Sequence, residues 1–185
     1  MSIYACPLED HWSAVKRIMC SLQAAATYGL HITRDSLLSL HGFTDANWAG
    51  SIDDRKSTSG YLVYPGSTPI SWKSRKQRTV VRSSTEAKYK PLADGTAEIL
   101  WIHSLLSELR VPSSTVTTLW CDNLGATFLS ANPVFHARTK HVEIDYHLVC
   151  DCVTKRENQV RFISSKDQLA DVLTKPFPPV SFVYF

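Results

Sequence analysis

Three strand-like segments follow one another before any long helical pattern begins, and this order restricts the folds open to the chain. They cover residues 38–44 and 59–64, and a third segment begins at 70–72. A turn rich in Pro and Gly at 65–69 separates the second from the third, which predicts an antiparallel hairpin. Strands grouped in this way and followed by alternating helices and strands predict an α/β protein of the α+β kind, with a mixed sheet flanked by helices.

The second half of the chain predicts helices that alternate with two further strands. A long helix opens with Ser83-x-x-Glu86, which matches a capping box, and its apolar face runs toward Leu109. Pro91 falls inside this pattern and predicts a kink. The remaining elements are a strand at 116–121, helices at 123–129 and 142–153, a strand at 160–163 and a helix at 166–174. The later strands must therefore be reached by crossovers.

Length and composition limit the chain to one main domain and argue against a uniformly basic surface. A chain of 185 residues with 44% apolar residues can bury one ordinary core. A formal net charge of +3 means that any contact with nucleic acid must come from a local patch. Five cysteines without regular spacing, and no signal peptide or long apolar span, predict a reduced intracellular protein, cytoplasmic or nuclear, with no membrane partner.

Four carboxylates occupy positions that a mixed sheet can bring together. Asp45 ends the first strand and Asp122 ends the fourth, so the two are neighbours if these strands pair. Glu86 begins the long helix, and Asp171 lies on the last one. Repulsion among such carboxylates is relieved by a bound cation, and an oxygen-rich pocket suits magnesium or manganese. Each residue alone is equally compatible with a cap, a turn or a solvated helix face.

Seven blocks of sequence give the chain a more specific resemblance. They are GFTDANWAG at 42–50, DRKSTSGY at 54–61, ISWKSRKQ at 70–77, SSTEAKY at 83–89, CDN at 121–123, RTKH at 138–141 and QLADVLTK at 168–175. In this order they resemble the ribonuclease H region of copia-type LTR-retrotransposon Pol polyproteins. The resemblance implies a ribonuclease H-like domain at 38–177. Residues 1–37 resemble the segment that connects this region to reverse transcriptase, and 178–185 form a tail.

The resemblance implies a type 1 ribonuclease H, which cuts the RNA strand of an RNA–DNA hybrid and leaves 5′-phosphate ends. It implies two magnesium ions, with manganese as a substitute, held by Asp45, Glu86, Asp122 and Asp171. A reverse-transcriptase domain is a further expected partner, and a small-molecule partner is not expected. The chain departs from the family at Lys88, where Glu is usual. Cellular members of the wider superfamily carry a histidine in the loop before the last carboxylate, whereas residues 164–167 of this chain contain none.

A basic run and several polar residues are the predicted contacts to the hybrid. Lys73, Arg75, Lys76 and Arg78 follow the third strand and are expected to bind phosphates without sequence preference. The polar residues near the motifs, expected to sense 2′-hydroxyls, are Asn47, Ser57, Thr58 and Asn123. A solvated basic surface is the alternative interpretation of the run.

Other functions remain open at this stage. Lys88 and Pro91 favour a retroelement-derived nucleic-acid-binding or interaction protein with weak or lost catalysis. A different nuclease of the same superfold, such as an integrase or resolvase, fits the seven blocks less well. A zinc site among His136, His141, His147, Cys150 and Cys152 is disfavoured, because their spacing matches no common structural zinc pattern.

Overall fold

The computed structural model describes residues 8–30, 32, 39–111, 116–132 and 143–175. The chain divides into two units, Met1–Ile32 and Thr33–Phe185. The first unit contains helix α1 (Glu9–Ala24), which buries none of its residues. The predicted domain boundary between 37 and 38 and the predicted tail at 178–185 lie outside the described residues. None of the described helices is long and apolar enough to cross a membrane.

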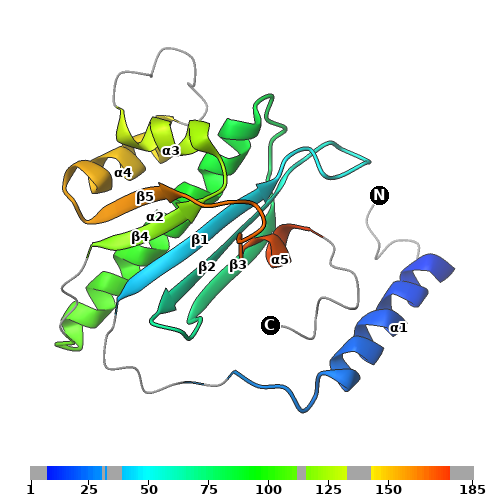
Figure 1. Cartoon of the computed structure of the whole chain (residues 1–185). Coiled ribbons are helices and arrows are strands. Elements are labelled where there is room, and N and C mark those ends of the chain that lie inside the picture. Colours follow the sequence, from blue (N-terminus) through cyan, green and yellow to red (C-terminus); the bar gives the residue numbers. More distant parts are fainter. Residues whose placement is uncertain (1–7, 31, 33–38, 112–115, 133–142, 176–185) are drawn as a thin grey trace. The chain divides into compact units, whose positions relative to one another are not determined.

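The second unit is built on a five-stranded mixed sheet in the order β3-β2-β1-β4-β5 (Figure 1). The strands are β1 (Leu40–Asn47), β2 (Thr58–Pro65), β3 (Ser71–Lys76), β4 (Thr117–Cys121) and β5 (Asn158–Phe162). β1 pairs antiparallel with β2, and β2 with β3, whereas β1–β4 and β4–β5 are parallel. The predicted hairpin and the predicted mixed sheet with flanking helices are therefore confirmed.

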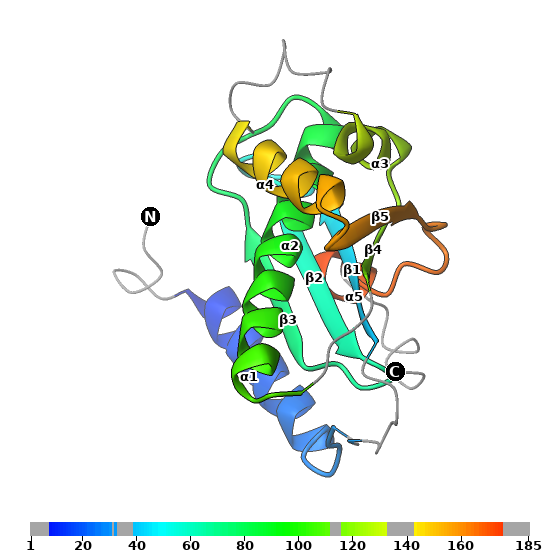
Figure 2. The same ribbon diagram turned by 90° about the vertical axis from the view of Figure 1, so that its left-hand side faces the viewer.

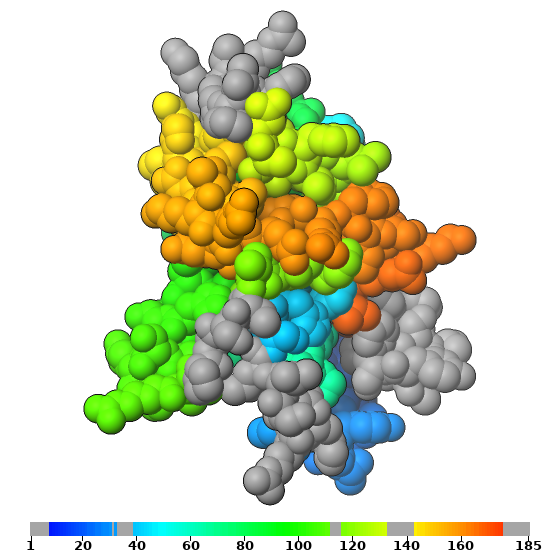
Figure 3. Space-filling view, turned by 60° about the vertical axis from the view of Figure 1, so that its left-hand side comes forward, coloured from blue at the N-terminus to red at the C-terminus, as the bar shows by residue number. Residues whose placement is uncertain are grey.

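Helices cover both faces of this sheet. The long helix α2 (Ser84–Glu108) packs on β1 and β2, and α4 (Glu143–Thr154) packs on α2 (Figure 2). The short helix α5 (Asp171–Thr174) lies on the opposite face, against β2 and β1. Helix α3 (Leu124–Ala131) contacts α4 and β5, and the three form one continuous surface (Figure 3).

The core lies between α2 and the sheet. Val63 and Leu119 from the strands are buried against Leu92 and Ile99 from the helix. Apolar burial of this kind contributes roughly 25 cal/mol for each Å² removed from water. The packing of α2 on the sheet fixes the rotation of the helix about its axis. This rotation determines which residues of α2 face the ends of β1 and β4.

Three details differ from the sequence-based expectations. Ser83 is the N-cap of α2, but its side chain makes no capping hydrogen bond, so the predicted capping box is wrong. β3 extends to Lys76, so Lys73, Arg75 and Lys76 belong to the strand rather than to a loop after it. The last helix begins only at Asp171. In the last two cases tertiary pairing, which local patterns do not report, determines where the element starts or ends.

Candidate active site

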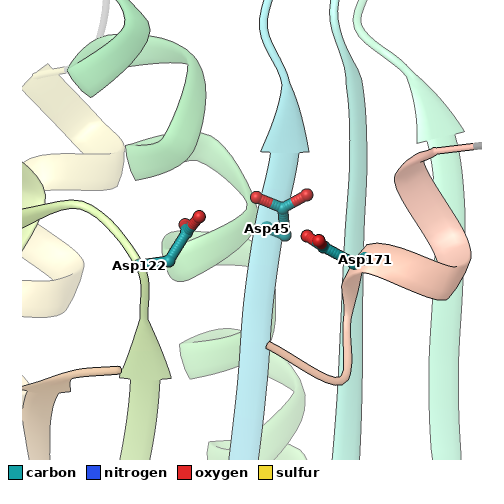
Figure 4. A group of neighbouring side chains, drawn as sticks. All are labelled: Asp45, Asp122 and Asp171. Atoms are coloured by element: carbon teal, nitrogen blue, oxygen red, sulfur yellow. The ribbon is translucent and has the colours of Figure 1, made fainter. Parts of the chain in front are cut away.

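Three of the four predicted carboxylates converge at one end of the sheet. The parallel register of β1 and β4 pairs Thr44 with Cys121, so the next residues, Asp45 and Asp122, are neighbours. Asp171, the first residue of α5, reaches the same place from the opposite side (Figure 4). One carboxylate oxygen from each residue lies within 4.8 Å of the other two.

Asp45 is the most enclosed member of this cluster. Its side chain is fully buried, the Thr174 hydroxyl donates a hydrogen bond to Oδ2, and Lys88 Nζ lies 3.0 Å from Oδ1. Burial alone raises the pKa of Asp45, but the Thr174 hydrogen bond and the Lys88 charge outweigh it and hold the pKa below its ordinary value. Asp45 is therefore ionised at neutral pH.

Lys88, on α2, bridges two of the carboxylates. Its Nζ lies 2.5 Å from Asp122 Oδ1 and 3.0 Å from Asp45 Oδ1, and its side chain is only 16% exposed. Burial lowers the pKa of Lys88, but the hydrogen bond to Asp122 and the charges of both carboxylates raise it above its ordinary value. A protonated ammonium thus stands between Asp45 and Asp122.

Asp171 has a second lysine as its partner. Lys175 Nζ, one helical turn further on, lies 2.7 Å from Oδ2 of Asp171. The other oxygen, Oδ1, is buried and accepts no hydrogen bond from the described part of the chain. Burial raises the pKa of Asp171, and the negative charge of Asp45 adds to this, against the lowering effect of Lys175.

Asp122 does not cap helix α3, which was the purely structural interpretation of this residue. Asn123 is the N-cap of α3, and its Oδ1 accepts the Ala126 N–H at 2.8 Å. Asp122 instead accepts the Ser165 hydroxyl at 3.0 Å on Oδ2 and the Lys88 ammonium on Oδ1. Its carboxylate therefore belongs to the cluster.

Glu86 does not join the three aspartates. It lies in the first turn of α2, half-buried, and is not part of the group of oxygens within 4.8 Å. Lys88 is the α2 residue directed at this group, and a helix turns by about 200° over two residues, so Glu86 and Lys88 face opposite ways. The role predicted for Glu86 therefore rests on sequence alone. The departure from the family pattern at position 88 was the sequence signal that pointed to Lys88.

The cluster is compatible with divalent metal use, and Lys88 competes with a metal for two of its carboxylates. Three carboxylates offer the hard oxygen ligands that magnesium and manganese prefer. Lys88 already places a positive charge against two of them, and the fourth predicted ligand lies outside the group. A full two-ion site would require the ammonium to leave.

Three of the predicted substrate contacts share a sheet face with Asp45. The register aligns Asn47 with Thr58 and Thr58 with Lys76 in one row across β1, β2 and β3. Asp45 lies two residues from Asn47 on β1, and alternate residues of a strand point to the same face. Lys76 also forms an ion pair with Asp54, at 2.8 Å.

The other predicted contacts are distributed differently. Lys73 and Arg75 alternate with Lys76 and so face α2, where Lys73 pairs with Asp94 at 3.2 Å. Arg75 and Arg78 are exposed and, with Lys76 and Lys90, line one surface pocket. Ser57 is buried, and its hydroxyl accepts the Ala49 N–H at 3.0 Å, which keeps it from the surface. Asn123 uses its side-chain oxygen as the cap of α3.

The sheet order, with carboxylates on β1 and after β4 and helices on both faces, defines the ribonuclease H-like fold. Solved structures agree. LC11-RNase H1 in complex with RNA/DNA hybrid matches 74% of this chain and 94% of its own, with TM-score 0.53 and 10% identity. The foamy viral protease-reverse transcriptase in complex with RNA/DNA hybrid matches 80% of this chain and 22% of its own, with TM-score 0.51 and 10% identity.

Sequence comparison finds relatives of much higher identity than these solved structures. The retrovirus-related Pol polyproteins from transposons RE2 and RE1 of Arabidopsis thaliana are 49% and 48% identical over 97% of this chain. Over nearly its whole length the chain is similar to a region of these retrovirus-related Pol polyproteins from copia-like transposons, and it has the ribonuclease H fold. It spans 12% of the length of each of these relatives. No protein-family model matches the sequence.

Proposed function

We propose that this chain is a nuclease domain that hydrolyses the RNA strand of RNA–DNA hybrids with the help of a divalent metal. The observation that carries the proposal is the convergence of Asp45, Asp122 and Asp171, from three separate elements, within 4.8 Å. Like charges gathered at the end of a sheet are costly unless a cation compensates them, which is the arrangement used for phosphoryl chemistry. The family and the fold support the same reaction class.

In this proposal the three aspartates hold the metal and the neighbouring sheet face holds the hybrid. A bound divalent ion supplies Lewis-acid activation of the phosphodiester and a more acidic water. Asp45 is the most buried member of the cluster, and the hydrogen bond that it accepts from the Thr174 hydroxyl holds its carboxylate in position. In the same proposal, Asn47, Thr58 and Lys76, which share this sheet face, contact sugar hydroxyls and phosphates of the hybrid.

The proposed substrate and partner are supported by what the similar structures contain. Two of them, LC11-RNase H1 and the foamy viral protease-reverse transcriptase, were solved with an RNA/DNA hybrid. We propose the same substrate class here, and a reverse-transcriptase domain as a partner. The finer predictions, two magnesium ions with Glu86 as a ligand and products with 5′-phosphate ends, belong to this proposal too. The ion pairs of Lys88 and the position of Glu86 outside the cluster are observations against the two-ion site.

A second candidate function is a domain that binds hybrids without cutting them. Lys88 favours it, because its ammonium is paired with two of the three carboxylates that the metal needs. The two candidates differ in one measurable property. Both bind the hybrid through the face that carries Asn47, Thr58 and Lys76, but only the first hydrolyses it.

A labelled hybrid separates the two functions. The full chain is incubated with an RNA–DNA hybrid labelled at one RNA end, in magnesium, manganese, calcium or chelator, and binding is followed in parallel by fluorescence anisotropy. We expect cleavage in magnesium or manganese only, with duplex DNA and single-stranded RNA left intact, and no cleavage by Asp122→Asn. Binding without cleavage in every metal would instead establish the hybrid-binding domain.

The binding face is tested with a matched pair of lysine variants. Lys76→Ala should weaken hybrid binding and reduce its salt dependence, because one phosphate contact is lost. Lys155→Ala removes the same charge from an exposed position between α4 and β5 and should leave binding unchanged. Equal losses in both variants would show that only net charge matters.

A further inference from the structure

We infer that the Lys88 ammonium is the resident cation of the acidic cluster and pairs with carboxylate oxygens of Asp45 and Asp122 that would otherwise be open to a divalent ion. Its Nζ lies within 3.0 Å of an oxygen of each residue, and one oxygen from each of the three aspartates lies within 4.8 Å of the other two. The inference rests on the proposed function only in treating the cluster as a cation site.

The formal charges of the cluster support this assignment. Asp45, Asp122 and Asp171 carry three negative charges, and Lys88 and Lys175, each within 3.0 Å of a carboxylate oxygen, carry two positive charges. The net formal charge of the cluster with its two lysines is therefore one negative charge, whereas the carboxylates alone carry three. Since the attraction for a divalent ion depends on the charge that remains uncompensated, the paired lysines weaken metal binding.

The backbone beneath Lys88 is held firmly. Its neighbours on α2, Ala87 and Tyr89, are 0% and 2% exposed, and both belong to the packed interior. The helix therefore cannot turn Lys88 away without disturbing the core. A divalent ion can enter only if the side chain alone swings out and gives up both ion pairs.

Two consequences follow from a resident ammonium. The cluster is stable in the absence of metal, because Lys88 compensates the buried charge of Asp45. A divalent ion competes with Lys88 for the same oxygens, so its apparent affinity is reduced by the free energy needed to displace the side chain. Removing the ammonium should strengthen metal binding and make stability depend on metal.

Manganese binding without nucleic acid tests the inference directly. Mn²⁺ is titrated into the full chain and the free ion is measured by electron paramagnetic resonance for the wild type, Lys88→Gln and Lys90→Gln. Lys90 is two positions further along α2 and donates to Thr79 Oγ1 rather than to the cluster, so it is the matched control. We expect Lys88→Gln to bind Mn²⁺ at least tenfold more tightly than the wild type, and Lys90→Gln to match the wild type. Equal affinities in all three would overturn the inference.

Two further variants keep the test decisive if Lys88→Gln does not fold in chelator. Folding of that variant on addition of Mn²⁺ would itself support the inference, because a ligand that binds only the native state stabilises it. Lys88→Arg keeps a cation in place and should bind Mn²⁺ as weakly as the wild type. Lys88→Glu adds a carboxylate and should bind most tightly. If the wild type binds Mn²⁺ as tightly as Lys88→Gln, and Asp45→Asn abolishes this binding, a resident ammonium would be refuted.

The outcome is independent of the nuclease assay. A chain in which Lys88→Gln gains Mn²⁺ affinity while no variant binds or cuts a hybrid would support the resident ammonium and contradict the proposed function. Hybrid cleavage by the wild type together with unchanged Mn²⁺ affinity in Lys88→Gln would support the proposed function and contradict the resident ammonium.

Discussion

At the scale of single residues, Lys88 reverses the energetic effect expected of the carboxylates. Considered from sequence, like charges at the end of a sheet repel, and removing one is expected to stabilise the chain without metal. In the structure Asp45 is ion-paired with Lys88 and hydrogen-bonded by Thr174. The charges of the cluster are therefore compensated by neighbouring groups. Removing one member leaves another buried group without its ion-pair or hydrogen-bond partner.

Replacing Asp45 with Asn tests this sign. Because Asp45 is fully buried and Lys88 would keep only Asp122, we expect the free energy of unfolding to fall by about 1–3 kcal/mol in chelator. Urea denaturation followed by circular dichroism measures the change, and Asp151→Asn, at an exposed position on α4, is the control. A more stable Asp45→Asn variant would show that repulsion dominates after all.

At the scale of elements, α2 shows how a helix accommodates an internal proline. Pro91 has no N–H to donate to the Ala87 carbonyl four residues earlier, a defect that costs roughly 3 kcal/mol in an isolated helix interior. The Gln77 side chain, buried beside the helix, donates its Nε2–H to that carbonyl at 2.9 Å. A residue outside the helix thus replaces the missing backbone donor.

A double-mutant cycle on Gln77 and Pro91 measures this compensation. Gln77→Ala should cost about 1–3 kcal/mol of stability when Pro91 is present, because the Ala87 carbonyl loses its donor. In the Pro91→Ala background the backbone N–H of residue 91 takes over, so the same substitution should cost about 1 kcal/mol less. Additive effects in urea denaturation would show that the two residues are independent.

The short helix α5 is positioned by a glycine on the neighbouring strand. Gly60 pairs with Asp45 across β1 and β2, and a Cβ added there would lie 2.8 Å from Leu173 Cβ and 3.1 Å from Thr174 Cγ2. The absence of a side chain at Gly60 is therefore what allows α5 to bring Asp171 and Thr174 to the cluster.

Gly60→Ala should displace α5 from the sheet. We expect a loss of about 1–3 kcal/mol from overpacking, together with weaker Mn²⁺ binding, since Asp171 moves with the helix. Gly29→Ala is the control, because a Cβ at Gly29 meets no atom within 4 Å. Unchanged metal binding alongside reduced stability would mean that Asp171 contributes little to the site.

At the scale of the whole molecule, the sheet and every residue of the cluster belong to the unit Thr33–Phe185. α1 buries none of its side chains, and Trp12, Ile18 and Leu22 are exposed. The strands and helices that place the carboxylates are thus complete without the first unit.

A chain that starts at Thr33 should fold with the same midpoint of thermal unfolding as the full chain. The reason is that its core residues and their packing partners are all retained. Differential scanning calorimetry measures the midpoint, and cleavage or binding of the hybrid measures the site. A lower midpoint would place residues 1–32 in the folding unit.

Much of the fold and two members of the site follow from local sequence. The order of strands and helices is read from apolar patterns and turn residues, which act within windows of a few residues. Asp45 and Asp122 follow from the pairing of the first and fourth strands, which a strand order with crossovers favours. The seven motif blocks point to the same Pol polyprotein relatives without any coordinates.

The rotation of α2 is what only the tertiary structure decided. A helical pattern shows which face is apolar, but Glu86 and Lys88 both lie at its first turns. The burial of Ala87 and Leu92 in the core and the stacking of Tyr89 on Tyr146 of α4 select the residue that faces the aspartates. The extent of β3 and the arrival of Asp171 on α5 likewise depend on partners distant in sequence. Sequence alone therefore determined that carboxylates meet, and long-range packing determined that a lysine meets them.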